Sequence, residues 1–100
     1  MIVNLTELQV LHLPEKQRFE IRAEGHIAEL TYTLHNGTIT FLHTGVPPEL
    51  EGQGVGAKLV MASLEYARAN GLKIKSLCWF VTLHLKRHPE YQTNAKTRFL

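Results

Sequence analysis

The sequence predicts an α/β or α+β sheet domain, and two local patterns carry this prediction. Apolar and polar residues alternate over residues 27–34 and 38–46, and Asn36-Gly37 separates the two runs. Asn-Gly between alternating strands favours a tight hairpin, because both central residues of that turn need positive φ. A helical pattern over residues 54–70 then precedes a further alternating stretch. Strands and helices are therefore expected to share one fold.

The hairpin also predicts a register. A two-residue loop fixes which residues lie opposite each other on the two strands. The predicted pairs are Leu34 with Ile39, Tyr32 with Phe41, and Leu30 with His43. His43 would then lie at the far end of an otherwise apolar face. A shorter strand is expected over residues 19–23, after a turn at Pro14.

The second half of the chain predicts two helices and one strand. Apolar residues recur at helical spacing over residues 54–70, and Asn70-Gly71 is typical of a helix end. A strand is expected over residues 73–78, where charged and apolar residues alternate. A second helix is expected over residues 79–87, stopping before Pro89.

Length and composition limit the classes of protein. A chain of 100 residues with 44% hydrophobic content supports one modest core, so residues 1–100 are expected to form a single domain. The first dozen residues fit helix or strand, and residues 1–15 are treated as an extension of uncertain structure. No stretch suits a membrane span or a signal peptide, so we expect a cytoplasmic protein without membrane contact. The lone Cys78 cannot form an internal disulfide, which agrees with a reducing compartment.

Several chemistries lack the residues that they need. The chain has no Asp, and its two serines, Ser63 and Ser76, lie outside any nucleophile motif, which argues against a serine-hydrolase triad and an Asp-based magnesium site. His84 and His88 could face one metal, but no third ligand accompanies them, so we expect no metal. A net charge of +2 is too small to argue for nucleic acid. That weaker alternative would use Lys73, Lys75, Lys86 and Arg87.

The stretch ELEGQGVGAK, residues 49–58, places three glycines at alternate positions before a helix. It formally contains G-x-G-x-x-A, but the acidic residue that a dinucleotide site needs about 20 residues later is missing. A plain flexible turn is the structural alternative. Glycine backbone at a helix start also presents N–H groups and the positive end of the helix dipole to a phosphate. We therefore expect this loop to bind an anion.

The loop resembles the acetyl-CoA pyrophosphate loop of the GNAT superfamily of N-acetyltransferases. The chain is most similar to the minimal members of that superfamily, which carry a characteristic cysteine. The resemblance covers about residues 19–92, and its segments are HTGVPPELEGQGVGAKLV (43–60), CWFV (78–81) and HPEY (88–91). It implies a reduced GNAT-type fold with a mostly antiparallel central sheet and two main helices.

The resemblance implies acetyl-CoA as cosubstrate. The strand that contains Thr44 and Val46 would bind its pantetheine arm, and Tyr91 would either place a hydroxyl near the thiol or pack under the last helix. The superfamily has Gln or Arg where this chain has Glu51, which places an acid beside the phosphates. The loop residues expected to bind the cofactor are Glu51, Gly52, Gln53, Gly54, Val55, Gly56, Ala57 and Lys58.

The same resemblance implies acetyl transfer to a primary amine, with Cys78 and His43 as the predicted catalytic residues. A helix starting at Trp79 would stabilise the Cys78 thiolate, which could accept the acetyl group, or the thiol could protonate the CoA sulfur. Simple burial in the core is the alternative for this cysteine. His43 could take a proton from the amine, or it could be a hydrogen-bonded core residue. The alternative function is a CoA-binding or protein-interaction module without turnover.

Overall fold

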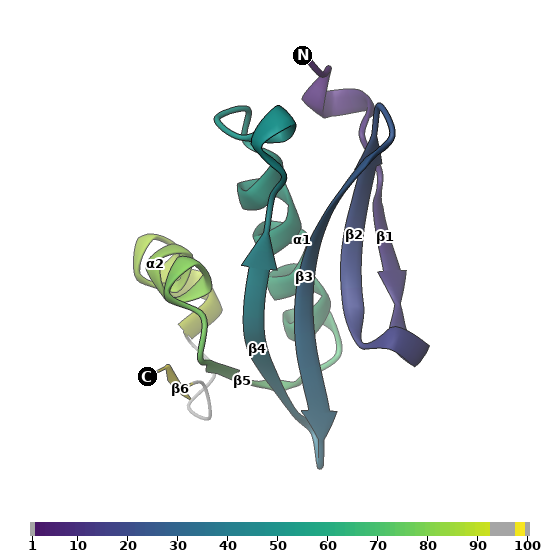
Figure 1. Cartoon of the computed structure of the whole chain (residues 1–100). Coiled ribbons are helices and arrows are strands. Elements are labelled where there is room, and N and C mark those ends of the chain that lie inside the picture. Colours follow the sequence, from purple (N-terminus) through teal and green to yellow (C-terminus); the bar gives the residue numbers. More distant parts are fainter. Residues whose placement is uncertain (1, 93–97, 100) are drawn as a thin grey trace.

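The structure is a computed structural model that describes residues 2–92 and 98–99. Within these residues, six strands form one sheet in sequence order, and two helices accompany it (Figure 1). The strands are β1 (Val10–Leu13), β2 (Arg18–Ala23), β3 (His26–His35), β4 (Thr38–Gly45), β5 (Lys73–Ser76) and β6 (Arg98–Phe99). The helices are α1 (Val55–Ala69) and α2 (Trp79–Arg87), and the 3-10 turns are η1 (Leu5–Glu7), η2 (Pro14–Lys16), η3 (Pro48–Leu50) and η4 (Pro89–Gln92).

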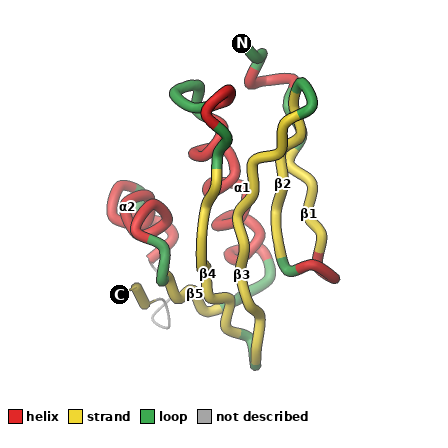
Figure 2. The backbone as a smooth tube through the Cα atoms, in the orientation of Figure 1, coloured by secondary structure: helices red, strands yellow, loops and turns green. Residues whose placement is uncertain are grey.

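The sheet is mostly antiparallel, as expected. Strands β1 to β4 pair antiparallel, whereas β5 pairs parallel to β4 and β6 pairs parallel to β5. The hairpin of β3 and β4 is the longest feature of the sheet (Figure 2). Its turn has φ of 49° at Asn36 and 77° at Gly37, which confirms the predicted turn with two positive φ angles.

The predicted register is right near the turn and wrong beyond it. Leu34 pairs with Ile39, and Tyr32 pairs with Phe41, as predicted. A β-bulge then leaves Leu42 without a partner, so that His43 opposes Thr31 and Leu30 opposes Thr44. Opposed residues share a face of the sheet, and Leu30 is fully buried. The bulge therefore moves His43 off the apolar face and brings Thr44 onto it.

Helix α1 crosses one face of the sheet and forms the core with it (Figure 1). Its buried stripe includes Leu59, Val60 and Leu64, all without exposed surface. On the sheet, the facing residues are Phe19, Ile21, Ala28 and Leu30. The helical spacing that predicted residues 54–70 is thus the spacing of the buried face, and the helix ends within one residue of that prediction.

The N-terminal segment joins the sheet. Strand β1 pairs along β2, from Val10 opposite Ile21 to Leu13 opposite Arg18. Pro14 then starts η2, and Gln17 takes the left-handed conformation with φ of 52° before β2 begins. Residues 10–13 were ambiguous from sequence because four residues are too few to separate a strand from a helix.

A buried carboxylate lies on the sheet face that α1 does not cover. Glu20 has no exposed surface, and two arginine side chains form ion pairs with it. Arg22 Nε donates to Glu20 Oε1 at 3.0 Å, and the guanidinium of Arg18 pairs with the other oxygen. Burial raises the pKa of Glu20, but the Arg22 hydrogen bond and the Arg18 charge outweigh it, and the pKa is lowered overall.

Replacing Glu20 by glutamine should lower the free energy of unfolding at pH 7 by about 1 to 3 kcal/mol, because charge-assisted hydrogen bonds are lost. A carboxylate with a lowered pKa stabilises the fold above its ordinary value of 4.5, and that contribution is lost as the pH falls through the lowered value. Urea unfolding of both proteins should therefore show the full difference at pH 7 and a smaller one as the pH falls below 4.5. A difference that stays the same as the pH falls would contradict this assignment.

Candidate functional site

Strands β4 and β5 separate beside the start of α2. They pair from Thr38 opposite Lys73 to Phe41 opposite Ser76, and Leu77 N donates to Phe41 O at 2.9 Å. Beyond this point β4 continues to Gly45 beside β3, and the described residues place no strand on its other edge. Backbone groups along that edge of β4 are therefore available to a ligand.

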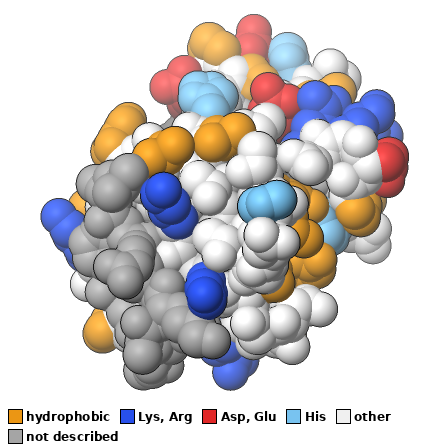
Figure 3. Space-filling model, turned by 90° about the horizontal axis from the view of Figure 1, so that it is seen from below, with side chains coloured by type: hydrophobic (Ala, Val, Ile, Leu, Met, Phe, Trp, Pro, Cys, Tyr) orange, Lys and Arg blue, Asp and Glu red, His pale blue; other side chains and the backbone are white. Residues whose placement is uncertain are grey.

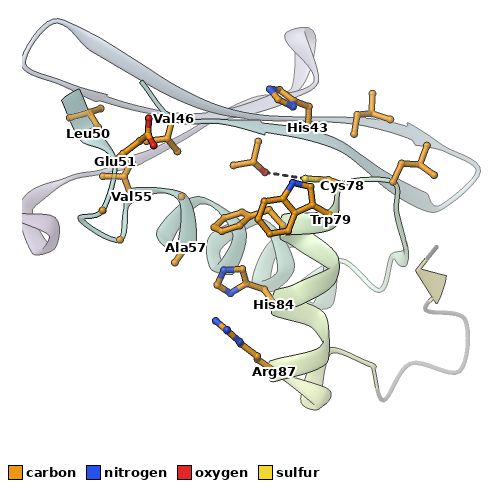
Figure 4. A pocket seen from close by; sticks show the side chains of 17 residues that line it. His43, Val46, Leu50, Glu51, Val55, Ala57, Cys78, Trp79, His84 and Arg87 are labelled. Atoms are coloured by element: carbon orange, nitrogen blue, oxygen red, sulfur yellow. Dashed lines mark hydrogen bonds between the residues drawn. The ribbon is translucent and has the colours of Figure 1, made fainter. Parts of the chain in front are cut away.

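A cavity of about 770 Å³ lies at this separation (Figure 4). Such a volume is typical of small-molecule sites. One wall is β4 with the residues after it, a second is the glycine-rich loop with the first turn of α1, and the third is α2. The lining residues are Leu42, His43, Thr44, Val46, Leu50, Glu51, Gly52, Gly54, Val55, Gly56, Ala57, Leu77, Cys78, Trp79, Phe80, His84 and Arg87.

The glycine-rich loop presents bare backbone at the start of α1. Gly54 is the N-cap with φ of 82°, a conformation that costs about 1 to 2 kcal/mol for residues with a side chain. No side chain caps the helix, so its first N–H groups face outward at the positive end of the dipole. A Cβ at Gly56 would lie 3.1 Å from Phe80 Cε2 and 3.3 Å from Val46 Cγ2. Gly56 thus also allows α2 to approach α1. This packing is a second reason for a glycine at this position, and the sequence did not reveal it.

Cys78 lies where its thiol faces the cavity. It is the N-cap residue of α2 and 7% exposed, and its Sγ lies 3.6 Å from Thr44 Oγ1 (Figure 4). Two buried hydroxyls hold the backbone here, because Ser76 Oγ donates to Cys78 O at 2.9 Å and accepts from Thr82 Oγ1 at 2.9 Å. Sequence reasoning missed Ser76 and Thr82 as positioning residues, since neither belongs to a recognisable motif.

His43 borders the cavity but does not meet Cys78. Figure 4 shows its ring on the far side of β4 from the thiol, as the bulged register requires. The side chain is exposed, and a Cβ at Gly45 would lie 3.3 Å from its Nε2. The expected position of His43 at the end of the apolar face is therefore wrong, and Thr44 occupies that place. A catalytic role for His43 stays a prediction.

Three of the predicted cofactor residues do not line the cavity. Gln53 Oε1 accepts from Val3 N at 2.9 Å, and Tyr91 Oη donates to Glu65 of α1 at 2.9 Å. The ammonium of Lys58 donates to the carbonyls of Leu5 and Leu8, at 2.5 and 2.6 Å. These side chains hold the N-terminal segment and η4 against α1. The other eight predicted cofactor residues are among those that line the cavity.

Replacing Lys58 by methionine should lower the free energy of unfolding by about 1.5 to 3 kcal/mol, the range for hydrogen bonds from a charged donor. The reason is that the carbonyls of Leu5 and Leu8 both lose the charged donor that they share. Urea unfolding measures the effect, with Lys75→Met as control because Lys75 is exposed on β5. Unchanged stability together with weaker acetyl-CoA binding would instead place the Lys58 ammonium on the phosphates.

Helix α2 contributes residues that sequence reasoning did not assign to the site. Phe80, His84 and Arg87 follow one another at positions i, i+4 and i+7, so they share one helix face, and this spacing was the available signal. His84 is only 8% exposed, and its Nδ1 has no hydrogen-bond partner. Burial lowers the pKa of His84, and the charges of His88 and Arg87 lower it further. Trp79 also lines the cavity, and its side chain is 77% exposed.

Other classes of site find little support in the described residues. No group of three potential metal ligands occurs among residues 2–92 and 98–99, although the rings of His84 and His88 stack with centroids 6.2 Å apart. On the face that Figure 3 shows, lysine and arginine side chains are mostly separated by other residues and form no continuous basic stripe. In the same part of the chain, every helix is too short or too polar to cross a membrane.

Comparisons with known proteins agree with this geometry. A family model described as GCN5-related N-acetyl-transferase matches residues 18–94. No curated protein matched the chain. Among solved structures, a GCN5-like protein from Staphylococcus aureus is 38% identical, with a TM-score of 0.68 over 95% of this chain and 90% of that one. The chain therefore belongs to the GCN5-related N-acetyltransferase family.

Proposed function

We propose that this protein transfers the acetyl group of acetyl-CoA to a primary amine. Acetyl-CoA-dependent acetyl transfer is the activity of its family. One observation carries the proposal. The unpaired edge of β4, the start of α1 without a side-chain cap, and the Cys78 thiol all line the same cavity. A cytoplasmic location, where a lone thiol stays reduced, is part of the proposal.

The residues present fit an elongated thioester with a pyrophosphate. Backbone N–H groups from Gly54 to Ala57 would bind the pyrophosphate at the positive end of α1. The backbone of residues 42–46 would bind the pantetheine amides, as an added strand would. The thioester would then lie near Thr44 Oγ1 and Cys78 Sγ, two atoms that are 3.6 Å apart.

Cys78 is the group proposed to act on the thioester. In one route its thiolate attacks the acetyl carbonyl and the bond to the CoA sulfur breaks; the amine then takes the acetyl group, and its proton passes to the departing Cys78 sulfur. In the other route the amine attacks the thioester directly, the Cys78 thiol gives its proton to the departing CoA sulfur, and the proton lost by the amine restores the thiol. Rapid quenching followed by mass analysis of the Cys78 peptide separates the routes, because only the first leaves one acetyl group on that peptide.

Thermal unfolding with and without acetyl-CoA tests the proposal. Ligand at 100 times its dissociation constant stabilises a protein by about 2.7 kcal/mol. For a domain of this size the midpoint should rise by roughly 10 °C or more. No rise at high acetyl-CoA concentration would overturn the proposed function. A rise without release of free CoA across a panel of primary amines would favour the module without turnover.

A charge introduced at the loop tests where the cofactor binds. Replacing Gly54 or Gly56 would disturb the fold, because Gly54 has positive φ and a side chain at Gly56 would lie too close to Phe80 and Val46. Ala57, in the first turn of α1, is the better position, since Ala57→Glu places a carboxylate beside the phosphates and suits a helix start. Ala57→Gln is the matched neutral control. The acetyl-CoA shift should be lost in Ala57→Glu and largely kept in Ala57→Gln, and equal shifts in both would place the ligand elsewhere.

A further inference from the structure

We propose that Arg87, the last residue of α2, binds a phosphate group of the coenzyme and supplies the positive charge that the glycine-rich loop lacks. This inference rests on the proposed function. A cationic side chain for the phosphates would be expected from the loop, and the inference assigns it to α2 instead.

The charges around the cavity lead to Arg87 by elimination. Among the described lining residues, Glu51 and Arg87 are the two with permanent charge. Glu51 is exposed on the loop and repels a phosphate. Lys58, the one cation within the loop segment, donates instead to the carbonyls of Leu5 and Leu8. A coenzyme with several phosphate charges therefore finds its cationic partner in Arg87.

The position of Arg87 suits this role. Figure 4 shows Arg87 and His84 on the wall of the cavity that faces Ala57 and the start of α1. The close approach of Phe80 to Gly56 holds this face of α2 against the loop. The side chain of Arg87 is exposed and makes no ion pair or hydrogen bond with any other described residue, so its guanidinium is available to a ligand. Its planar fork of donors matches two oxygens of one phosphate, which a lysine cannot do.

A second observation points to an anion at the same wall. His84 is more than nine-tenths buried, lines the cavity, and has an Nδ1 atom without a partner. Burial lowers the pKa of the ring, and the charges of His88 and Arg87 lower it further. A phosphate bound by Arg87 would lie on the same wall as this nitrogen, which donates a hydrogen bond in its N–H form. The side chains of His84 and Arg87 therefore both suit a bound anion on this wall of the cavity.

The test compares Arg87→Met with Lys86→Met, a control on the neighbouring exposed residue that does not line the cavity. Calorimetric titrations at one fixed salt concentration use acetyl-CoA, acetyl-3′-dephospho-CoA and acetyl-pantetheine, which carries no phosphate. Arg87→Met should bind acetyl-CoA roughly 10- to 100-fold more weakly, the range for a charge-assisted hydrogen bond. Lys86→Met should bind it as the wild type does, and all three proteins should bind acetyl-pantetheine alike.

The three ligands also show which phosphate is bound. A loss that disappears with the dephospho compound assigns Arg87 to the 3′-phosphate, and a loss that persists assigns it to the pyrophosphate. Unchanged acetyl-CoA affinity in Arg87→Met would overturn the inference and leave the proposed function intact. An equal loss for acetyl-pantetheine would also overturn it, because the effect would then come from the fold. If the wild type binds no acetyl-CoA, the proposed function fails and the inference fails with it.

Discussion

Replacing Cys78 by alanine should lower the rate of acetyl transfer by about 10²- to 10⁴-fold, the range for loss of a positioned acid or base. Affinity for acetyl-CoA should change little, because the proposed phosphate and pantetheine contacts come from the loop, β4 and α2. The fold should persist, since alanine suits a residue that is 7% exposed and whose side chain does not cap α2. Steady-state release of free CoA, together with calorimetric titration of acetyl-CoA, measures the two effects separately.

Thr44→Val is the matched control for this prediction. It removes the hydroxyl that lies 3.6 Å from Cys78 Sγ and leaves the thiol in place. A smaller loss of rate than in Cys78→Ala is expected, because the threonine only orients the thiol. Full turnover by Cys78→Ala would exclude the thiol from the chemistry and favour direct transfer without it. Loss of both binding and turnover would show that Cys78 acts through the structure of the cavity.

The local elements could be predicted because their signals are short-range. Asn36-Gly37 fixes the hairpin turn through positive φ, and the helical spacing of apolar residues fixes α1. The helix predicted over residues 79–87 has the observed bounds of α2, and Pro89 limits its end. Each of these signals lies within a few residues of the feature that it determines.

The predicted register misses the bulge, because it extends the regular pairing set by a two-residue hairpin loop along the whole of both strands. Phe41 and Leu42 are two apolar residues in succession, which interrupts the alternation of residues 38–46, and Leu42 is the extra residue. With the bulge, Thr44 shares a face with Leu30 and approaches Cys78. Without it, the register would place His43 there, as the sequence suggested. A one-residue shift thus changes which side chain of β4 meets the thiol.

The sequence could predict which backbone segments meet at the cavity, but only partly which side chains line it. The loop, Thr44, Val46 and Cys78 line one cavity, as a shared site requires. Gln53, Lys58 and Tyr91 instead contact the N-terminal segment and Glu65. Those contacts join residues about 25 to 55 positions apart, and local spacing carries no signal for them. The resemblance to the family could therefore locate the loop but could not orient its side chains.

Replacing Phe41 by alanine should cause the largest loss of stability, about 3 to 5 kcal/mol, the range for a buried phenylalanine. Phe41 has no exposed surface and is the last residue of β4 to pair with β5, so the variant leaves a void at the point where the strands separate. Because small domains have only about 5 to 15 kcal/mol in total, the unfolding midpoint should fall by more than about 10 °C.

Leu42→Ala is the control for Phe41, because Leu42 is the neighbouring residue and is 39% exposed at the bulge. It should cost less than about 1.5 kcal/mol, since a half-exposed side chain loses little burial. Urea unfolding with a common slope for the three proteins measures both costs. Equal losses of unfolding free energy in the two variants would mean that backbone pairing, and not the Phe41 side chain, stabilises the point where β4 and β5 separate. A much larger cost for Phe41→Ala would show that packing beneath the last β4–β5 pair stabilises the fold at the point where the strands separate, which is where the cavity lies.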